Sequence, residues 1–190
     1  MADAPPLPDF NEYDLVLVAD FGHGLLNAAA VNERIARKGR ALVAAMAQVN
    51  SSNYGYNLPT KYHEADYYSL NRTEAELCLR ERNLPLGELI ARISRLLDAE
   101  TLSVTDGDQG VIVKKGGDVF CLPTISTSVV DTIGCGDAYF ALSSIAAALD
   151  QPAFFMALAG SIGAAGVAQR RGNESPVSEA EFMTIGKIVI

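Results

Sequence analysis

Asp131-Thr132-Ile133-Gly134-Cys135-Gly136-Asp137 is the most informative part of this sequence, because it places two glycines and two carboxylates directly before a long apolar segment. That segment predicts a helix from about Ala138 to Leu149. Glycines at 134 and 136 let backbone N–H groups turn toward an anion, and the positive end of the helix dipole adds to the attraction. Asp137 would then lie beside a bound phosphate, where a carboxylate can take the proton of an attacking hydroxyl. By itself, Gly-x-Gly before a helix is also an ordinary tight turn.

Two further polar patterns lie upstream. Asn71-Arg72-Thr73-Glu74 puts an amide and a carboxylate three residues apart at a predicted helix start, so both lie on one helix face. The same spacing is typical of a helix cap. Thr105-Asp106-Gly107-Asp108-Gln109-Gly110 is a turn whose glycines let the backbone approach a ligand closely, or a turn that only joins two strands.

These motifs, in this order, resemble the signatures of the ribokinase-like (PfkB-type) carbohydrate kinases. The first is similar to Asp-Thr-x-Gly-Ala-Gly-Asp with Cys135 for alanine, and the others are similar to Asn-x-x-Glu and Thr-x-Gly-x-x-Gly. Asp20-Phe21-Gly22-His23-Gly24 resembles the Asp-Tyr-x-Lys-Gly turn of the heptose-phosphate kinase branch, with His23 replacing lysine. Residues 50–62 resemble a segment of sugar kinases fused to a nucleotidyltransferase domain; the alternative is a surface loop whose tyrosines pack on the body.

The resemblance implies an enzyme, a carbohydrate kinase that transfers phosphate from ATP to a hydroxyl of a sugar or sugar phosphate. It implies a catalytic set made of a base and an anion hole of backbone amides: Asp137, Gly134, Cys135 and Gly136. It implies nucleotide-binding roles for a second set: Thr105, Gly107, Gly110, Asn71, Glu74, Asp131 and Thr132. Within that set, Asn71 and Glu74 would organise Mg²⁺ through water, as magnesium's preference for oxygen ligands allows. Asp131 would bind a monovalent cation or position the Gly134 loop.

Apolar runs alternate with helical patterns along the chain, which predicts an α/β fold with a mostly parallel sheet. Strands are expected at 15–19, 41–47, 66–69, 102–105, 111–114 and 118–122, the last two as a hairpin. Helices are expected at 28–38, 73–81, 86–97, 138–149, 151–169 and 178–185. The resemblance specifies the ribokinase-like three-layer α/β/α arrangement. Asp20, Asn71, Thr105 and Asp131, each expected just after a strand, would line one crevice.

The resemblance extends from about Tyr13 to Val177 and matches only the second half of the family's fold. We therefore expect a domain truncated at its N-terminal side, with residues 1–12 as a leader or linker and residues 13–190 as the C-terminal part of a kinase domain. A cut sheet exposes an edge strand, so a homo-oligomer or a longer multidomain chain is expected. The alternative function is a non-catalytic nucleotide-binding or assembly module, and a structural domain without nucleotide is a third.

Composition and charge indicate which broad class of protein this chain belongs to. With 49% hydrophobic and 20% charged residues, the chain is an ordinary globular domain. Its net charge of −8 argues against binding to nucleic acid or to an anionic membrane. The three cysteines are odd in number and widely spaced, which indicates reduced thiols and a cytoplasmic location. Neither His23 nor His63 is placed near Cys135, so a cysteine nucleophile is not favoured, and no zinc ligand set emerges.

Overall fold

The computed structural model describes residues 6–125, 128–172 and 174–189. Its centre is a six-stranded sheet whose strands lie side by side in chain order. They are β1 (Leu15–Asp20), β2 (Leu42–Ala47), β3 (Tyr67–Asn71), β4 (Thr101–Thr105), β5 (Val111–Lys115) and β6 (Asp118–Leu122). The first four are parallel, whereas β5 pairs antiparallel with both β4 and β6. The expected mostly parallel sheet and its hairpin are confirmed.

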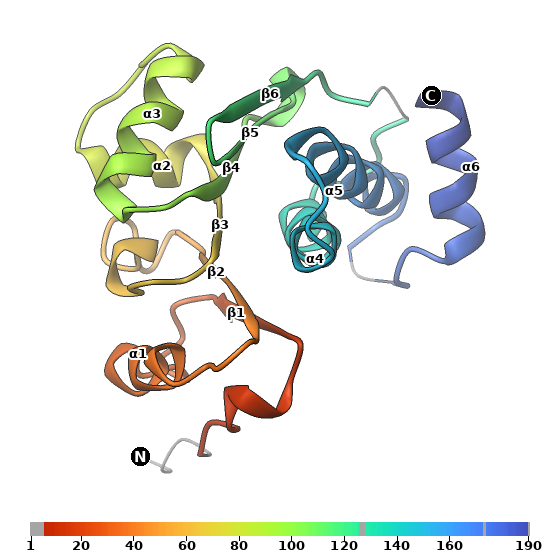
Figure 1. Cartoon of the computed structure of the whole chain (residues 1–190). Helices are drawn as coiled ribbons and strands as arrows, with labels where there is room; N and C mark the ends of the chain where they lie inside the picture. Colours follow the sequence, from red (N-terminus) through yellow and green to blue (C-terminus); the bar gives the residue numbers. More distant parts are fainter. Residues whose placement is uncertain (1–5, 126–127, 173, 190) are drawn as a thin grey trace.

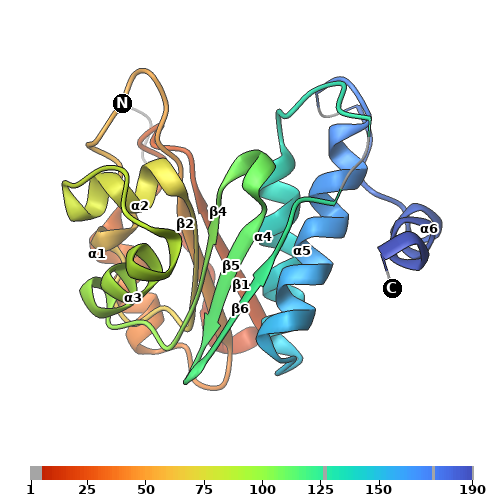
Figure 2. The same cartoon turned by 90° about the horizontal axis from the view of Figure 1, so that it is seen from above.

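Helices cover both faces of this sheet, which gives three layers (Figures 1 and 2). One face carries α1 (Ala28–Ala36), α2 (Arg72–Leu79) and α3 (Leu86–Leu97); the other carries α4 (Cys135–Ala148) and α5 (Ala153–Ala168). The last helix, α6 (Glu179–Val189), packs outside α5. The three-layer α/β/α class is therefore confirmed.

Each face of the sheet has its own apolar core. The core under α1–α3 is supplied by one face of each helix; in α3 the buried positions recur at helical spacing, at Leu89, Ile93 and Leu97. The core under α4 and α5 includes Tyr67 and Met156. The Tyr67 hydroxyl satisfies its buried polarity with Ser103 (2.6 Å) and Ser143 (2.8 Å), which ties the sheet to α4.

Two expectations about the glycine-rich stretch need correction. Helix α4 begins at Cys135, not near Ala138, with Gly134 as N-cap in the left-handed region (φ 82°). Gly136 and Asp137 therefore belong to the first helical turn, because glycine is tolerated where the helix has not yet closed its hydrogen bonds. Asp131 does not follow a strand, since the described residues between β6 and α4 form none.

The described part of the expected leader contacts the body. Phe10 lies in a short 3-10 turn (Phe10–Glu12) and is buried in the same core as Val18 and Ile35. Residues 1–5 lie outside the described residues. Within the described ranges, no helix has the length and apolar character to cross a membrane.

Candidate active site

The carboxyl ends of β3 and β4 bring two of the sequence motifs together. Asn71 ends β3 and Thr105 ends β4, and the two residues are register partners in the parallel pair. The Thr105 hydroxyl donates to the carbonyl of Leu70 at 3.4 Å. This edge of the sheet is where ligands bind in open α/β sheets.

Glu74 closes a capping box at the start of α2. Its backbone N–H donates to the Asn71 side chain (2.8 Å), and its carboxylate accepts from the Asn71 N–H (2.8 Å). The carboxylate also accepts from the Val49 N–H (3.2 Å), and the residue is only 4% exposed. Burial raises the pKa of Glu74, the two amides lower it in part, and the charge of Asp137 raises it. The helix-cap interpretation is therefore confirmed, and the negative charge of Asp137 acts on the pKa of Glu74.

The start of α4 offers unpaired backbone donors. The Cys135 N–H donates to the Thr132 carbonyl at 3.2 Å, whereas the N–H groups of Gly136 and Asp137 have no acceptor among the described residues. A Cβ added at Gly136 would meet no atom within 4 Å, so the backbone is open there and packing does not require glycine. Free N–H groups at the positive end of a 14-residue helix form an anion-binding arrangement.

Asp137 is half-buried in the same first turn. Burial raises the pKa of its carboxyl group, and no hydrogen bond reaches that group from the residues described. A carboxylate without a protein donor, beside open amides, is chemically suited to accept a proton from a bound hydroxyl.

Asp131 fixes the loop that leads into α4. Its carboxylate accepts from the N–H groups of Ile133 (3.0 Å) and Gly172 (2.9 Å), and these hydrogen bonds lower the pKa of Asp131. Its own N–H donates to the Ala168 carbonyl at 3.3 Å. The Gly134 loop is thereby tied to the end of α5.

The turn between β4 and β5 contains two glycines with different requirements. Gly107 has φ +54°, and an added Cβ there would meet nothing within 4 Å. Gly110 has φ +95°, and an added Cβ would lie 2.1 Å from the Leu122 carbonyl oxygen. Gly110 is therefore required by packing against the end of β6, while Gly107 leaves open backbone at the sheet edge. The Thr124 hydroxyl donates to the Gly107 carbonyl at 2.8 Å.

Arg72 joins this turn to the start of α2. Its guanidinium pairs with Asp106 at 2.7 Å and donates to the Leu84 carbonyl at 2.9 Å. The hydrogen bond to Asp106 is the main reason that the pKa of Arg72 is raised. The motifs that begin at Asn71 and at Thr105 are thus linked by an ion pair as well as by strand register.

Asp20 does not present its carboxylate to this site, contrary to the expectation of a shared crevice. It is 4% exposed and accepts from the Tyr62 hydroxyl (2.6 Å) and the Gly22 N–H (2.8 Å), and it forms an ion pair with Lys61. The Lys61 ammonium also donates to the Asn57 side chain at 2.5 Å. Burial acts to raise the pKa of Asp20, but the hydrogen bonds lower it overall.

This cluster was missed in the sequence. Lys61, from the long polar segment 50–62, supplies an ammonium to the Asp20 carboxylate, at the start of the turn that contains His23. The length and polarity of segment 50–62 indicate a functional loop, but the contacts of Lys61 and Tyr62 with Asp20 are visible only in the folded structure. Gly22 has φ +74°, a backbone conformation that favours glycine, and an added Cβ would crowd the side chains of Asn53 and Asn57.

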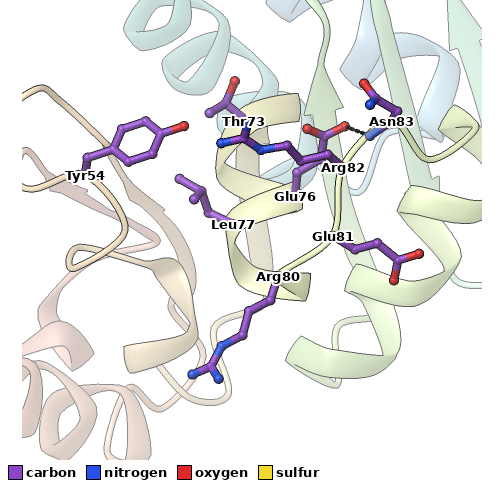
Figure 3. A pocket seen from close by; sticks show the side chains of 8 residues that line it. All are labelled: Tyr54, Thr73, Glu76, Leu77, Arg80, Glu81, Arg82 and Asn83. Carbon is purple, nitrogen blue, oxygen red and sulfur yellow. Dashed lines mark hydrogen bonds between the residues drawn. The ribbon is translucent and has the colours of Figure 1, made fainter.

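A separate hollow of about 650 Å³ lies on α2 and the turn after it (Figure 3). It is lined by Tyr54, Thr73, Glu76, Leu77, Arg80, Glu81, Arg82 and Asn83. Two of its carboxylates are already bonded: Glu76 accepts from the Asn83 N–H (2.9 Å), and Glu81 pairs with Arg92 (2.6 Å). No residue of the glycine-rich stretch lines it, so it is distinct from the candidate site.

Metal and thiol chemistry receive little support from the protein side chains themselves. The described residues contain no group of three or more His, Cys, Asp or Glu side chains that could hold a metal ion. Cys78, Cys121 and Cys135 are free thiols. Burial, with the charge of Asp131, raises the pKa of Cys135, which disfavours the thiolate that a nucleophile requires.

A glycine-initiated helix and a half-buried carboxylate, on a mostly parallel sheet between two helical layers, define a ribokinase-like α/β domain. Solved structures share this fold. Ribokinase from Thermotoga maritima superposes with a TM-score of 0.76 at 21% identity, over 95% of this chain and 60% of that one. Arabidopsis thaliana ribokinase, solved with ribose and ATP, gives 0.73 at 18% identity, over 94% and 57%. The chain belongs to the pfkB family of carbohydrate kinases, whose family model matches residues 8–179.

Sequence relatives carry the name bifunctional protein HldE. That of Geobacter sulfurreducens is 28% identical over 188 residues, which is 91% of this chain and 35% of the relative. That of Nitrobacter hamburgensis is 29% identical over 146 residues, which is 75% of this chain and 29% of the relative. The chain thus spans about a third of the length of these relatives. The resemblance to sugar kinases of this branch is confirmed.

Proposed function

We propose that this chain forms the nucleotide and base part of a sugar kinase, which transfers a phosphoryl group from ATP to a hydroxyl of a sugar or sugar phosphate. The observation that carries the proposal is the start of α4. Within the described residues, the N–H groups of Gly136 and Asp137 have no acceptor there, and the Asp137 carboxylate accepts no hydrogen bond. Membership of the pfkB family and the ATP-containing ribokinase neighbour support it.

In the proposed reaction, Asp137 takes the proton of the acceptor hydroxyl. The hydroxyl oxygen forms a bond to the γ-phosphorus, and the bond from that phosphorus to the bridging oxygen of ADP breaks. The N–H groups at Gly136 and Asp137, with the amide of Gly134 beside them, stabilise the negative charge on the transferred group, and Cys135 holds the turn through its N–H hydrogen bond to the Thr132 carbonyl. Because these donors are fixed in a helix start, they need no rearrangement as the charge develops.

The nucleotide-binding roles of the sheet edge form the second part of the proposal. Open backbone at Gly107, next to Thr105, would lie along the nucleotide phosphates, with Gly110 holding the turn and Asp131 and Thr132 holding the α4 loop. Asn71 and Glu74 would hold Mg²⁺ through water, where the ion would neutralise phosphate charge. The Asn71 and Val49 N–H groups each donate to one Glu74 oxygen, which leaves lone pairs for water but fits no direct cage of ligands. A monovalent cation at Asp131 would share that carboxylate with the two N–H groups that already donate to it.

The phosphoryl acceptor, the cellular compartment and the assembly are proposed from similarity to other proteins and from composition. A heptose-phosphate-like acceptor is proposed because the relatives belong to the HldE proteins. The cytoplasm is proposed because three free thiols suit a reducing compartment. We also propose a homo-oligomer or a longer multidomain protein as the functional form.

The first test is a calorimetric titration of the purified chain with ATP and with ADP, each with and without Mg²⁺. The proposal predicts saturable binding that magnesium changes, and loss of that binding at high phosphate concentration. A folded sample without nucleotide binding would contradict the assignment of a nucleotide site to this chain. Where binding is found, ADP release with sugar phosphates and unphosphorylated sugars then identifies the acceptor.

A further inference from the structure

Strand β1 has the sequence of an interior strand in the position of an edge strand. Its Leu15-Val16-Leu17-Val18-Ala19 run is apolar at every position, which is typical of strands covered on both faces. Yet β1 pairs only with β2, and no other described strand lies along its outer side (Figure 1). Natural edge strands are protected by charges, proline or bulges, and this run contains none.

The two faces of β1 differ in how they are covered. Val18 is buried in the core beneath α1, with Val16 packed against that core. The other face carries Leu15, Leu17 and Ala19, of which Leu17 is 41% exposed. Leu17 therefore places an exposed apolar side chain on the open edge.

Hydrogen bonds to β2 establish which backbone groups of β1 point outward. The carbonyl of Asp14 accepts from the Leu42 N–H (3.0 Å), and that of Asp20 accepts from the Gln48 N–H (2.8 Å). Backbone direction alternates along a strand, so the even-numbered residues face β2. The N–H and C=O groups of Leu15, Leu17 and Ala19 consequently face outward. Two of these three residues, Leu17 and Ala19, also have exposed side chains, and Leu15 is half-buried.

We propose that this edge pairs with β1 of a second copy of the chain, antiparallel about a twofold axis at Leu17. Leu17 then opposes Leu17 of the other copy, and Leu15 opposes Ala19 on either side. All three are hydrogen-bonded pairs, which gives about six backbone hydrogen bonds across the axis. Continued alternation brings Tyr13 opposite Phe21, both of which are exposed in the single chain.

The pattern selects this register over its neighbours. A shift by one residue would oppose outward-facing groups with groups that are already bonded to β2. A shift of the axis to Leu15 or Ala19 would leave part of the apolar run unpaired. The flanking carboxylates do not oppose the pairing strongly, because Asp14 is 3.7 Å from Arg40 and Asp20 is paired with Lys61. The edge is therefore complementary to itself in backbone hydrogen bonding and in apolar surface.

The first experiment is the mass of the chain in solution by light scattering over a range of concentrations. The proposal predicts about twice the chain mass of 20.2 kDa, and a Leu17→Lys variant of single mass. Val119→Lys is the matched control, because Val119 is a 53% exposed residue on β6, the opposite edge of the sheet. A wild-type chain that stays a monomer, or a Leu17→Lys variant that stays a dimer, overturns the proposal.

Cross-linking tests the register without relying on a destabilising charge. In a background with the exposed Cys121 replaced by serine, Leu17→Cys should form a covalent dimer under mild oxidation, because opposed residues in such pairs lie ~5.5 Å apart between Cα atoms. Leu15→Cys alone should not, whereas Leu15→Cys with Ala19→Cys should. Cross-linking at Val119→Cys in place of Leu17→Cys would show that the other edge associates and would overturn the assignment. Nucleotide binding enters neither readout, so the two proposals fail separately.

Discussion

Tyr62 donates its hydroxyl hydrogen to the Asp20 carboxylate over 2.6 Å, across 42 positions of the sequence. Lys61 approaches the same carboxylate as an ion pair, and the Asn57 side chain donates to the Asp20 carbonyl at 3.1 Å. The long polar segment is thereby fixed to the end of β1 by one buried anion. Much of the local stability at this corner depends on that anion.

Tyr62→Phe should lower the free energy of unfolding by about 1–3 kcal/mol, because a buried carboxylate loses a hydrogen-bond donor. Urea denaturation measures this change. Tyr54→Phe is the control: Tyr54 is 51% exposed, and no hydrogen bond from its hydroxyl is found in the described residues. Equal losses in the two variants would contradict the role of the Asp20 contact.

The same corner gives a pH dependence of stability. Hydrogen bonds hold the pKa of Asp20 below its ordinary value of 3.8, so the carboxylate stabilises the fold above that value. This contribution is lost as the pH falls from about 3.8 through the lower folded-state pKa. Thermal melts between pH 5 and pH 2 should therefore show a smaller acid-induced loss for Asp20→Asn than for the wild type.

Asp137→Asn tests the proposed base. In a catalytically competent form of the protein, kcat should fall by about 10²–10⁴-fold, because the amide cannot accept the proton, while nucleotide affinity stays nearly unchanged. Steady-state kinetics paired with calorimetry separates the two quantities. Full turnover by the variant would remove Asp137 from the mechanism.

Burial raises the pKa of Asp137, and a base works only when deprotonated. The kcat of the wild type should therefore rise with pH through a value above 3.8, the ordinary pKa of aspartate. The residual activity of Asp137→Asn should lack this rising limb. A limb that persists in the variant would belong to a different group.

Gly136→Ala separates binding from stability. Position 136 has open space for a methyl group and lies in a helix, so stability should be unchanged or increased by up to about 1 kcal/mol. ATP affinity should nevertheless fall if phosphate lies against that backbone. Gly87→Ala is a matched control, since Gly87 is the second residue of α3 and is equally open. Unchanged affinity in Gly136→Ala would place the phosphates elsewhere.

The two glycines of the β4–β5 turn should respond differently to alanine. Gly107→Ala should cost about 1–2 kcal/mol, the cost of a left-handed residue with a side chain. Gly110→Ala should cost more, because its methyl group would also collide with the Leu122 carbonyl. Denaturant unfolding of both variants measures the difference, and equal costs would mean that the end of β6 moves aside freely.

Much of this arrangement could be predicted from the sequence. Periodicity predicted the strands and the two helical layers, and the glycine-rich motif marked the helix start that carries Asp137. The sequence predicts the start of this helix at about Ala138, whereas α4 begins at Cys135, because glycine is acceptable in a first helical turn. The local sequence pattern does not show at which residue the helix begins.

The contacts of Asp20 and Arg72 could not be predicted, for a different reason. Asp20 meets Lys61 and Tyr62 only after a long segment has folded back onto the sheet edge. Arg72 meets Asp106 only because β3 and β4 are adjacent and in register. Such pairs depend on three-dimensional neighbours, which sequence spacing does not specify.

The Arg72–Asp106 pair has a mechanical consequence. The start of α2 and the β4–β5 turn are joined by this ion pair, and α2 is also joined to Val49 through Glu74. A displacement of the turn is therefore resisted by the helix, and a displacement of the helix by the turn. Coupling between two sites is reciprocal: if a ligand bound at the turn stabilises the position of the helix, a ligand bound at the helix stabilises the turn by the same free energy. The sheet edge should thus respond to its ligands as one stiff unit rather than as three independent loops.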